Sequence, residues 1–420
     1  MKQIVGMILA GGRVDELLVL TAKRPKSALP MWGMYRIIDF VLSNMMHAGI
    51  EVLGVLAQYR PYSLITHLAN GEPWDYMGRS RALRILSPFR GAEESDWYKG
   101  TADALYQNLN FITRHAPDLV VVASGDHVYA MDYRPMLKQH RETGADLTIA
   151  FKRVPREQAH LYGTAVLDAS GRVVSYEEKA KNPKGDLASL TVYVFNAGCL
   201  VERLQQNARE GKTFQIYSEI IPRMVEEKGR VFGWVFDGYW QYARTIDTYY
   251  ATNMDILGTD PPDLSAWRVR TNLNPETLGD PAPALFRPTA RVSSSLVCSH
   301  VALEGTVHHS VLSPGVVVEP GAIVRDSVLM HHCRVEAGAV VDRVILDKNV
   351  RVGKGACVGC GDMMPNRQHP QTLSSGVTVI GKGSRIPPGL RIGRSCIVYP
   401  DLREEDFPQA EVPAGAVVCP

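Results

Sequence analysis

The chain is 420 residues long, more than one small domain needs and enough for two or three. Its hydrophobic fraction of 45% and charged fraction of 21% are ordinary for a globular protein and exclude wholesale disorder. Lys and Arg number 46 and Asp and Glu 44, so a formal net charge of +2 provides no basic field for nucleic acid or a membrane surface.

No apolar stretch approaches the length of a transmembrane span, and the first residues lack the cleavage region of a signal peptide. Seven cysteines, an odd number in a large chain, indicate a reducing compartment with mostly inert thiols. We therefore expect a cytoplasmic protein that binds neither nucleic acid nor a membrane.

The first half alternates apolar runs with amphipathic segments, which predicts alternating strands and helices. Strands are predicted at residues 4–10, 52–56, 119–123, 147–151 and 190–195, and helices at 37–49 and 104–114. This order predicts an α/β fold with a Rossmann-like, mostly parallel sheet, whose ligands bind at the carboxyl ends of the strands. Gly12 and Asp126 both fall at such ends.

The composition changes near residue 257, where a stretch rich in Pro, Asp, Asn and Thr predicts a linker. Beyond it, similar segments start 17 residues apart at Val301, Val318, Val335 and Val352, each with a second valine six positions later. This period is typical of short parallel strands stacked into a β-helix. We expect a first domain at 1–257, a linker at 258–284 and a β-helix domain at 285–420, interrupted by an insertion at about 360–375.

A Gly-Gly turn after the first strand can cradle a phosphate, because bare backbone N–H groups approach an anion closely. Gly11 and Gly12 are followed by three cations within four residues, Lys23, Arg24 and Lys26. On charge alone these cations are interpreted as a solvated face, and the Gly-Gly turn alone is equally well a structural turn.

Longer motifs in a fixed order make the family resemblance specific. They are LAGGR (9–13), KRxK (23–26), YRIIDF (35–40), LSN (42–44), AQYRPYSL (57–64), WYKGTADALYQN (97–108), SGDHVYAMDY (124–133), ADLTIA (145–150), EEK (177–179), GYW (238–240), SVLSPGV (310–316) and ILDKNV (345–350). With them the chain resembles the bacterial ADP-glucose pyrophosphorylases, or glucose-1-phosphate adenylyltransferases, over nearly its whole length.

This resemblance implies a nucleotidyltransferase domain followed by a left-handed parallel β-helix. Enzymes of the family combine ATP and glucose 1-phosphate, with Mg²⁺, into ADP-glucose and pyrophosphate for glycogen synthesis. They are typically tetramers under allosteric control by phosphorylated metabolites. The chemistry needs cations around the phosphates and a metal held by carboxylates.

The resemblance also assigns roles to individual residues. Lys26 and Asp126 would be catalytic, with Lys26 on the phosphates and Asp126 as the ligand of Mg²⁺. Lys23 and Arg36 match positions associated with effector binding. The nucleotide would be bound by Gly11, Gly12, Gln58, Gly100 and Asp103, and glucose 1-phosphate by Tyr98, Gly163, Glu178, Lys179 and Ser189.

Two departures from the family pattern bear on catalysis. The family's loop GGRGTRL is GGRVDEL here, so that Glu16 replaces an arginine expected on the triphosphate, and Val14 and Asp15 lack glycine-like backbone freedom. The family's GYWxDVGT is GYWQYART here, so that Tyr242 replaces a second metal-binding aspartate and Arg244 a glycine. Losing one donor to the transition state typically costs about 3–4 kcal/mol.

Milder departures are Ser27, Ala180 and Thr191, where Thr191 for glycine narrows the floor of the sugar pocket. We therefore expect a catalytically impaired member of the family, a regulatory or ligand-binding subunit with a weakened Mg²⁺ site. It would assemble as a homotetramer, or as a heterotetramer with an active paralogue. The alternative is a working enzyme in which Arg13, Arg24 or Arg244 takes over phosphate binding.

Other candidates are weaker. The β-helix carries His308, His309, His331, His332 and Cys333, which could suit an acyltransferase base or zinc but are better interpreted as turn residues, because no fixed spacing pairs them with a carboxylate. Cys357 and Cys360 form a lone CxxC. A group of arginines is interpreted as a solvated or interface face, with effector binding as the alternative: Arg79, Arg81, Arg84 and Arg90.

Overall fold

The computed structural model describes residues 3–12, 14–88, 97–273, 282–408 and 410–420. It separates into two compact units. The sheet unit comprises Met1–Gly12, Ile38–Pro61 and Leu68–Trp240, and the β-helix unit comprises Arg13–Ile37, Tyr62–His67 and Gln241–Pro420. Because the units divide by contacts rather than by continuous segments, the boundaries at 257 and 285 stay predictions.

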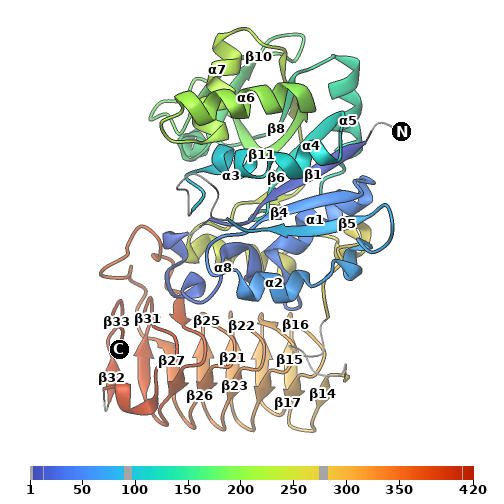
Figure 1. Cartoon of the computed structure of the whole chain (residues 1–420). Coiled ribbons are helices and arrows are strands. Elements are labelled where there is room, and N and C mark those ends of the chain that lie inside the picture. Colours follow the sequence, from blue (N-terminus) through green and yellow to red (C-terminus); the bar gives the residue numbers. More distant parts are fainter. Residues whose placement is uncertain (1–2, 13, 89–96, 274–281, 409) are drawn as a thin grey trace. The chain divides into compact units, whose positions relative to one another are not determined.

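The core of the sheet unit is one nine-stranded sheet with the order β10-β9-β11-β6-β1-β4-β5, in which β8 pairs with β11 and β12 (Figure 1). The strands are β1 (Ile4–Leu9), β4 (Val52–Leu56), β5 (Ala82–Leu86), β6 (Leu119–Ser124), β8 (Leu147–Arg153), β9 (Gly163–Leu167), β10 (Val173–Glu178), β11 (Leu187–Asn196) and β12 (Val231–Val235). Strands β6, β1, β4 and β5 are parallel, which confirms the predicted parallel core. Strand β11 runs antiparallel to β6, β8 and β9, so the second half of the sheet is mixed.

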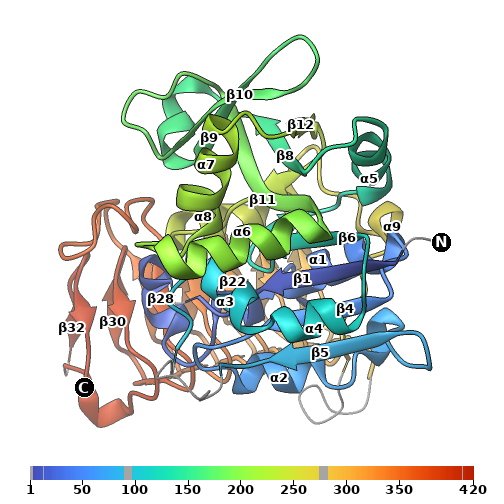
Figure 2. The ribbon, with the colours of Figure 1, turned by 45° about the horizontal axis from the view of Figure 1, so that its top comes forward.

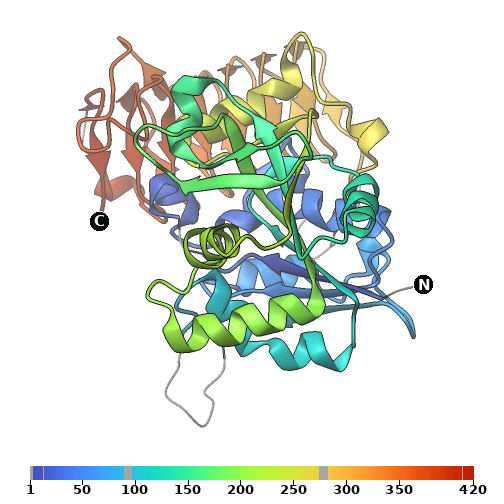
Figure 3. The same cartoon turned by 90° about the horizontal axis from the view of Figure 1, so that it is seen from above.

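The central strands β4 and β6 are buried at every residue, as expected for a sheet that helices cover on both faces. Helices α3 and α6 pack against each other, and α6 lies over β6 and β11, as Figures 2 and 3 show. The helices of this unit are α1 (Ile37–His47, of which Ile37 belongs to the β-helix unit), α3 (Thr101–Gln107), α4 (Leu109–Arg114), α5 (Tyr133–Glu142), α6 (Ala197–Glu210) and α7 (Ile221–Glu226), with the π-helical turn η5 (Ile216–Ile220) before α7.

The single helix predicted at 104–114 is wrong in one respect, because the structure breaks it at Asn108. The Asn108 side chain donates to the carbonyl of Ala104 at 2.9 Å and to the hydroxyl of Tyr98 at 3.0 Å. An asparagine that hydrogen-bonds locally in this way competes with the helix backbone. The break ties α3 to the loop before it.

The β-helix unit stacks short parallel strands into three sheets, the left-handed parallel β-helix expected from the hexapeptide period (Figure 1). One sheet holds β14 (Leu285–Phe286), β17 (Ala302–Leu303), β20 (Val317–Val318), β23 (Arg334–Val335), β26 (Arg351–Val352) and β29 (Arg385–Ile386). The second holds β15 (Arg291–Ser293), β18 (Thr306–His308), β21 (Ile323–Arg325), β24 (Val340–Asp342), β27 (Cys357–Cys360), β30 (Arg391–Gly393) and β32 (Glu411–Val412). The third holds β16 (Leu296–Val297), β19 (Val311–Leu312), β22 (Val328–Leu329), β25 (Val344–Leu346), β28 (Thr378–Ile380), β31 (Ile397–Val398) and β33 (Val417–Val418).

The predicted valine columns are largely confirmed. Val307, Val324, Val341 and Val358 pair in register and are all fully buried. In the column that contains Val318, Val335 and Val352, however, the residue paired with Val318 is Leu303 and not the expected Val301. The first coil is therefore shorter than the 17-residue repeat.

The β-helix unit also contains the N-terminal loop 13–37 and helix α8 (Ile246–Met254). Trp32 joins the two, because its backbone N–H donates to Asn253 Oδ1 at 3.1 Å and its indole N–H donates to the carbonyl of Thr252 at 2.7 Å. Within the predicted linker, α9 (Leu264–Trp267) forms one short helical turn, while 274–281 lie outside the described residues. None of the helices in the described part has the length and apolar character that a membrane crossing requires.

Candidate functional site

The carboxyl ends of β1, β4 and β6 bring three predicted site residues to one edge of the sheet. Leu9 pairs with Leu56 and with Ser124, so Gly11, Gln58 and Asp126 follow neighbouring strands. The carbonyl of Gly11 accepts from the N–H of Tyr59 at 3.1 Å. A Cβ at Gly11 would lie 3.0 Å from the nitrogen of Gln58, whereas one at Gly12 would meet nothing within 4 Å. Only Gly11 is therefore required by local packing.

The predicted nucleotide residues gather in the loop before α3, which we call the nucleotide loop (residues 97–103). Gln58 Oε1 accepts from the N–H of Tyr98 at 2.6 Å, and Asp103 Oδ2 accepts from the N–H of Lys99 at 2.8 Å. The Tyr98 hydroxyl donates to the carbonyl of Leu86 and accepts from the Asn108 amide, so Tyr98, which was predicted for the sugar group, lies among the predicted nucleotide residues.

Asp126, the predicted metal ligand, is 21% exposed and sits in a polar cluster. Its Oδ1 accepts a hydrogen bond from Ser124 and lies 3.4 Å from His127 Nε2. The indole N–H of Trp240 points at His127 Nδ1 at 3.3 Å. His127 Nδ1 also lies 3.1 Å from the carbonyl of Leu190, so the ring beside the Asp126 carboxylate is held between Leu190 and Trp240.

The described residues contain no group of three or more His, Cys, Asp or Glu side chains that could hold a metal ion. Mg²⁺ is commonly held by one or two carboxylates together with substrate phosphates and water. Asp126 therefore fits a Mg²⁺ ion that is bound partly by nucleotide phosphates, and it does not form a complete protein cage.

The predicted sugar residues meet across β9, β10 and β11. Gly163 pairs with Glu178, and a Cβ at Gly163 would lie 2.4 Å from Glu178 Oε2, so this glycine permits a close approach. Lys179 Nζ lies 3.8 Å from Glu178 Oε1. The Ser189 side chain is buried on β11 beside the phenol groups of Tyr176 and Tyr193.

Thr191 stands in this region with a backbone that favours glycine. Its φ is +53°, and it lies in the stretch of β11 where the register against β8 shifts. A β-branched residue rarely adopts such a φ, and positions of this kind cluster at functional sites. The replacement of the family's glycine therefore adds both bulk and backbone strain beside the sugar residues.

The two catalytic departures predicted from sequence pair with other side chains of the β-helix unit. Glu16, in the 3₁₀ turn η1 (Asp15–Thr21), accepts from Arg244 Nε at 2.8 Å and from Nη2 at 2.5 Å. Both side chains are about one third exposed, at 33% and 37%. Arg244 therefore neutralises the carboxylate that stands at the family's arginine position.

Lys26 packs against Tyr242, the second departure from the family pattern. Its Nζ lies 3.9 Å from the centroid of the Tyr242 ring, a cation–π contact, and the residue is only 1% exposed. The interpretation of Arg24 and Lys26 as a solvated face is wrong, because Arg24 is 2% exposed. Arg24 forms a buried ion pair with Asp347 of the β-helix. Lys23 alone fits that interpretation, being half exposed and paired with Asp401.

The backbone of the altered loop needs no glycine at residue 14. Val14 has a φ of −122°, in the extended region, and the positive φ falls instead on Leu18 at +48°. Thr21 Oγ1 donates to the carbonyl of Val14 at 2.9 Å and closes the turn. Arg13, one of the substitute cations of the alternative prediction, lies outside the described residues.

A basic cluster surrounds Arg36, one of the two predicted effector residues. Arg36 Nη1 donates to the carbonyl of Ser63 at 2.8 Å. Burial lowers the pKa of Lys348 well below its usual range, and the positive charges of Arg36 and Arg24 lower it further. Burial likewise lowers the pKa of His331, with Lys348 and Arg36 adding to the effect. Buried like charges of this kind favour an anion.

Sequence reasoning missed Arg24, His331 and Lys348 as members of this basic cluster. His331 Nδ1 is buried and has no hydrogen-bond partner among the described residues. Lys348 lies in the ILDKNV motif that was used only for the fold, and Arg24 directly follows Lys23. The adjacency of Arg24 to a predicted effector residue was the one signal in the sequence.

Among the weaker candidates, the turn interpretation holds for His309, whose φ is +44°. The prediction that no carboxylate pairs with these histidines is wrong, however. His309 Nδ1 lies 2.7 Å from Asp326 Oδ1, one 17-residue repeat along the chain. Cys357 and Cys360 are free thiols in β27. Arg81 pairs with Asp75 at the surface, and Arg90 lies outside the described residues.

The chain matches two known protein families. Residues 5–259 match the nucleotidyl transferase family, and residues 284–380 match the GlmU-like C-terminal hexapeptide family. The chain is 42% identical to the glucose-1-phosphate adenylyltransferase of Thermomicrobium roseum, with 100% of this chain and 98% of that protein covered. It is 41% identical to that of Thermotoga neapolitana (100% and 99% covered) and 38% identical to that of Acetivibrio thermocellus (99% and 98%). Because its two family matches and its full-length relatives agree, the chain belongs to the glucose-1-phosphate adenylyltransferase family.

Proposed function

We propose that this chain is a catalytically impaired member of the family that binds nucleotide and sugar phosphate and acts as a regulatory or ligand-binding subunit. The observation that carries the proposal is the ion pair between Glu16 and Arg244. It places a neutralised carboxylate where the family pattern has a free arginine for the triphosphate.

Of the other cations that the alternative names, Arg13 lies outside the described residues and Arg24 is already engaged, as is Lys26 of the same loop. Arg24 is buried against Asp347, and Lys26 is covered by the ring of Tyr242. Tyr242 also stands at the position of the second metal-binding aspartate. Nucleotidyl transfer depends on preorganised cations around the phosphates, so the loss of one arginine and one carboxylate should slow turnover by roughly 10⁴-fold or more.

The residues expected to bind ligands are nevertheless assembled. Gly11, Gln58 and the nucleotide loop form one connected group; Gly163 pairs with Glu178, and Ser189 lies on β11, which pairs with β9, the strand that contains Gly163. We propose ATP as the nucleotide and glucose 1-phosphate or a related sugar phosphate as the second ligand, with Mg²⁺ bound weakly through Asp126. All seven cysteines are free, which suits a cytoplasmic protein.

The basic cluster supports a regulatory role. Arg36, Lys348 and His331 would bind a phosphorylated metabolite, with Lys23 at the edge, while Arg24 stays paired with Asp347. Assembly as a homotetramer, or as a heterotetramer with an active paralogue, would let this ligand act on a partner's turnover.

The test is ADP-glucose synthesis by the purified chain alone, with ATP, glucose 1-phosphate and Mg²⁺, followed by pyrophosphate release. We expect a rate far below the roughly 10 s⁻¹ of a typical enzyme, with ATP binding still measurable by calorimetry. Turnover near 10 s⁻¹ would establish the alternative, an active enzyme in which Arg244 serves the phosphates despite Glu16. A chain that neither turns over nor binds ATP or sugar phosphate would refute both.

A further inference from the structure

The nucleotide loop depends on a neighbouring segment, residues 212–216, which we call the buttress. The carbonyl of Phe214 accepts from the N–H of Ala102 at 2.9 Å. Gln215 Oε1 accepts from both the N–H and the hydroxyl of Thr101, each at 3.0 Å, and that hydroxyl accepts from the N–H of Ile216 at 3.0 Å. Thr101 and Ala102, the first two residues of α3 after Gly100, are thus bonded to the buttress.

Gly100 also fits closely against the buttress. A Cβ at this position would lie 2.2 Å from the carbonyl oxygen of Phe214 and 2.7 Å from that of Thr213. Its φ of −177° is extended backbone that any residue adopts, so the glycine is required by the close approach alone. A shift of the buttress by a fraction of an ångström would therefore move the loop that holds Gly100, Asp103 and Tyr98.

One side chain fixes the buttress in place. Glu219 Oε1 accepts from the N–H groups of Lys212 at 2.8 Å and Thr213 at 2.6 Å. Its Oε2 accepts from the N–H of Phe214 at 3.1 Å and from the Asn207 amide at 2.6 Å. Asn207 is buried on α6, so the carboxylate joins the buttress to a helix that packs on the sheet.

Four donors on one carboxylate favour its ionised form. Burial alone would raise the pKa of Glu219, but the N–H of Thr213, the Asn207 amide and the N–H of Lys212 together lower it to about 2. The carboxylate is therefore ionised at every pH at which the protein would work. A neutral amide of the same length would turn two of its hydrogens toward N–H donors.

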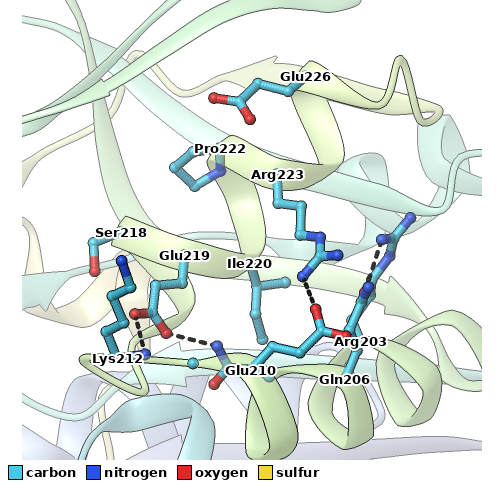
Figure 4. Close-up of a pocket in the computed structure, with 12 residues that line it drawn as sticks. Arg203, Gln206, Glu210, Lys212, Ser218, Glu219, Ile220, Pro222, Arg223 and Glu226 are labelled. Carbon is cyan, nitrogen blue, oxygen red and sulfur yellow. Dashed lines mark hydrogen bonds and ion pairs between the residues drawn. The ribbon is translucent and has the colours of Figure 1, made fainter.

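The Glu219 side chain lies in the wall of a cavity of about 360 Å³ between α6 and the η5–α7 segment. Figure 4 shows Glu219 at the Lys212 end of this cavity, with the ion pair of Arg223 and Glu210 farther along and Glu226 on the other wall. Glu226 thus provides a carboxylate in the same cavity that makes no contact with the buttress in Figure 4.

We propose that Glu219 is a positioning residue that holds the nucleotide loop in its ligand-ready geometry through the buttress. This inference rests on the proposed nucleotide binding, and it identifies the residue that keeps the nucleotide loop in position. Glu219 itself touches no ligand. Its contribution is the fixed position of the Thr213 and Phe214 carbonyls against Gly100 and Ala102.

The test compares Glu219→Gln with the matched variant Glu226→Gln in the full chain. Calorimetry with ATP, and separately with glucose 1-phosphate, should show ATP affinity about tenfold weaker in Glu219→Gln and unchanged in Glu226→Gln. Glucose 1-phosphate affinity should be the same in all three proteins. The conservative variant Glu219→Asp, which keeps two acceptor oxygens, should recover part of the lost ATP affinity.

Hydrogen exchange of the ligand-free proteins supplies a second readout that does not depend on ATP binding. Amides of residues 100–103 should exchange at least tenfold faster in Glu219→Gln, while those of β6 keep their wild-type rates. Equal exchange and equal ATP affinity in the two Gln variants would overturn the inference. So would a uniform loss of protection with both ligands weakened alike. If the wild type bound no ATP, the proposed function would fail, and the exchange rates alone would decide the role of Glu219.

Discussion

Glu16 and Arg244 are 228 residues apart in the chain, yet their side chains form one ion pair. Arg244 Nη2 and Nε both contact the same carboxylate oxygen, so the charge placed at residue 16 has a partner of opposite sign. Lys26 and Tyr242 form a second contact between the N-terminal loop and the segment near residue 242. Tyr242 and Arg244 thus both contact side chains of the N-terminal loop, Tyr242 with Lys26 and Arg244 with Glu16.

This pairing decides how activity could be restored. Glu16→Arg alone would set two guanidinium groups against each other, so we expect little gain in ADP-glucose synthesis. The triple variant Glu16→Arg, Tyr242→Asp, Arg244→Gly removes that repulsion and returns one cation and one carboxylate. It should raise turnover by at least roughly 10²-fold, the scale of one transition-state donor. Pyrophosphate release measures both variants.

Lys26→Ala in the triple variant is the control, since a restored enzyme should lose its gain when this lysine is removed. A single Glu16→Arg variant as fast as the triple one would show that Arg244 does not oppose a cation at position 16.

Each departure could be found from the sequence, because Glu16 and Tyr242 interrupt long motifs. Their contacts could not, since nothing in one sequence relates residue 16 to residue 244. The same holds for Glu219, whose role depends on three backbone N–H groups rather than on any motif. The sequence indicates that Thr191 adds bulk to the sugar pocket, but its φ of +53° can be known only from the structure.

At the scale of elements, the coils of the β-helix supply partners for the N-terminal loop. Asp347 directly follows β25 and is 1% exposed, and it forms an ion pair with Arg24, which is 2% exposed. Asp401 follows β31 and pairs with Lys23, where both side chains are about half exposed. One coil therefore holds the loop by a buried charge and another by a surface charge.

Asp347→Asn leaves the guanidinium of Arg24 buried without its charge partner, which should cost about 3–5 kcal/mol of unfolding free energy. Asp401→Asn removes a solvent-screened pair and should cost at most about 1 kcal/mol. Thermal or denaturant unfolding of the two variants measures the difference. Equal losses would mean that Arg24 finds another acceptor, and the assignment of a structural role to Asp347 would be wrong.

The elements themselves were the most predictable part of the molecule. Apolar periodicity located β1, β4, β6 and the valine columns, because burial on both faces leaves little choice of residue. The break at Asn108 and the short first coil were missed, since each depends on one side-chain bond or one register choice rather than on a period.

At the scale of the whole molecule, the basic cluster links solution conditions to stability. His331 has a pKa well below its ordinary value of 6.5 because it is buried near Lys348 and Arg36. As the pH falls through 6.5, the unfolded chain takes up this proton while the folded chain resists it, so the folded state loses stability. A bound anion would offset the nearby charges and raise the pKa of His331.

Inorganic phosphate should therefore raise the melting temperature, and more so at pH 6 than at pH 8. Phosphate at 100 times its dissociation constant stabilises the folded state by about 2.7 kcal/mol. Differential scanning calorimetry in phosphate and in chloride of equal ionic strength measures the effect, and His331→Gln should remove its pH dependence. Equal melting temperatures in the two salts at both pH values would contradict an anion site in this cluster.

The ion pair between Arg24 and Asp347 can form only late in synthesis, because 323 residues separate the two partners. At roughly 5–20 residues per second, the ribosome needs about 15–65 s to produce Asp347 after Arg24 has been made. During that interval Arg24 has no acceptor from the β-helix. The N-terminal loop is thus among the earliest segments made, yet its buried charge gains its native partner only when most of the chain has been synthesised.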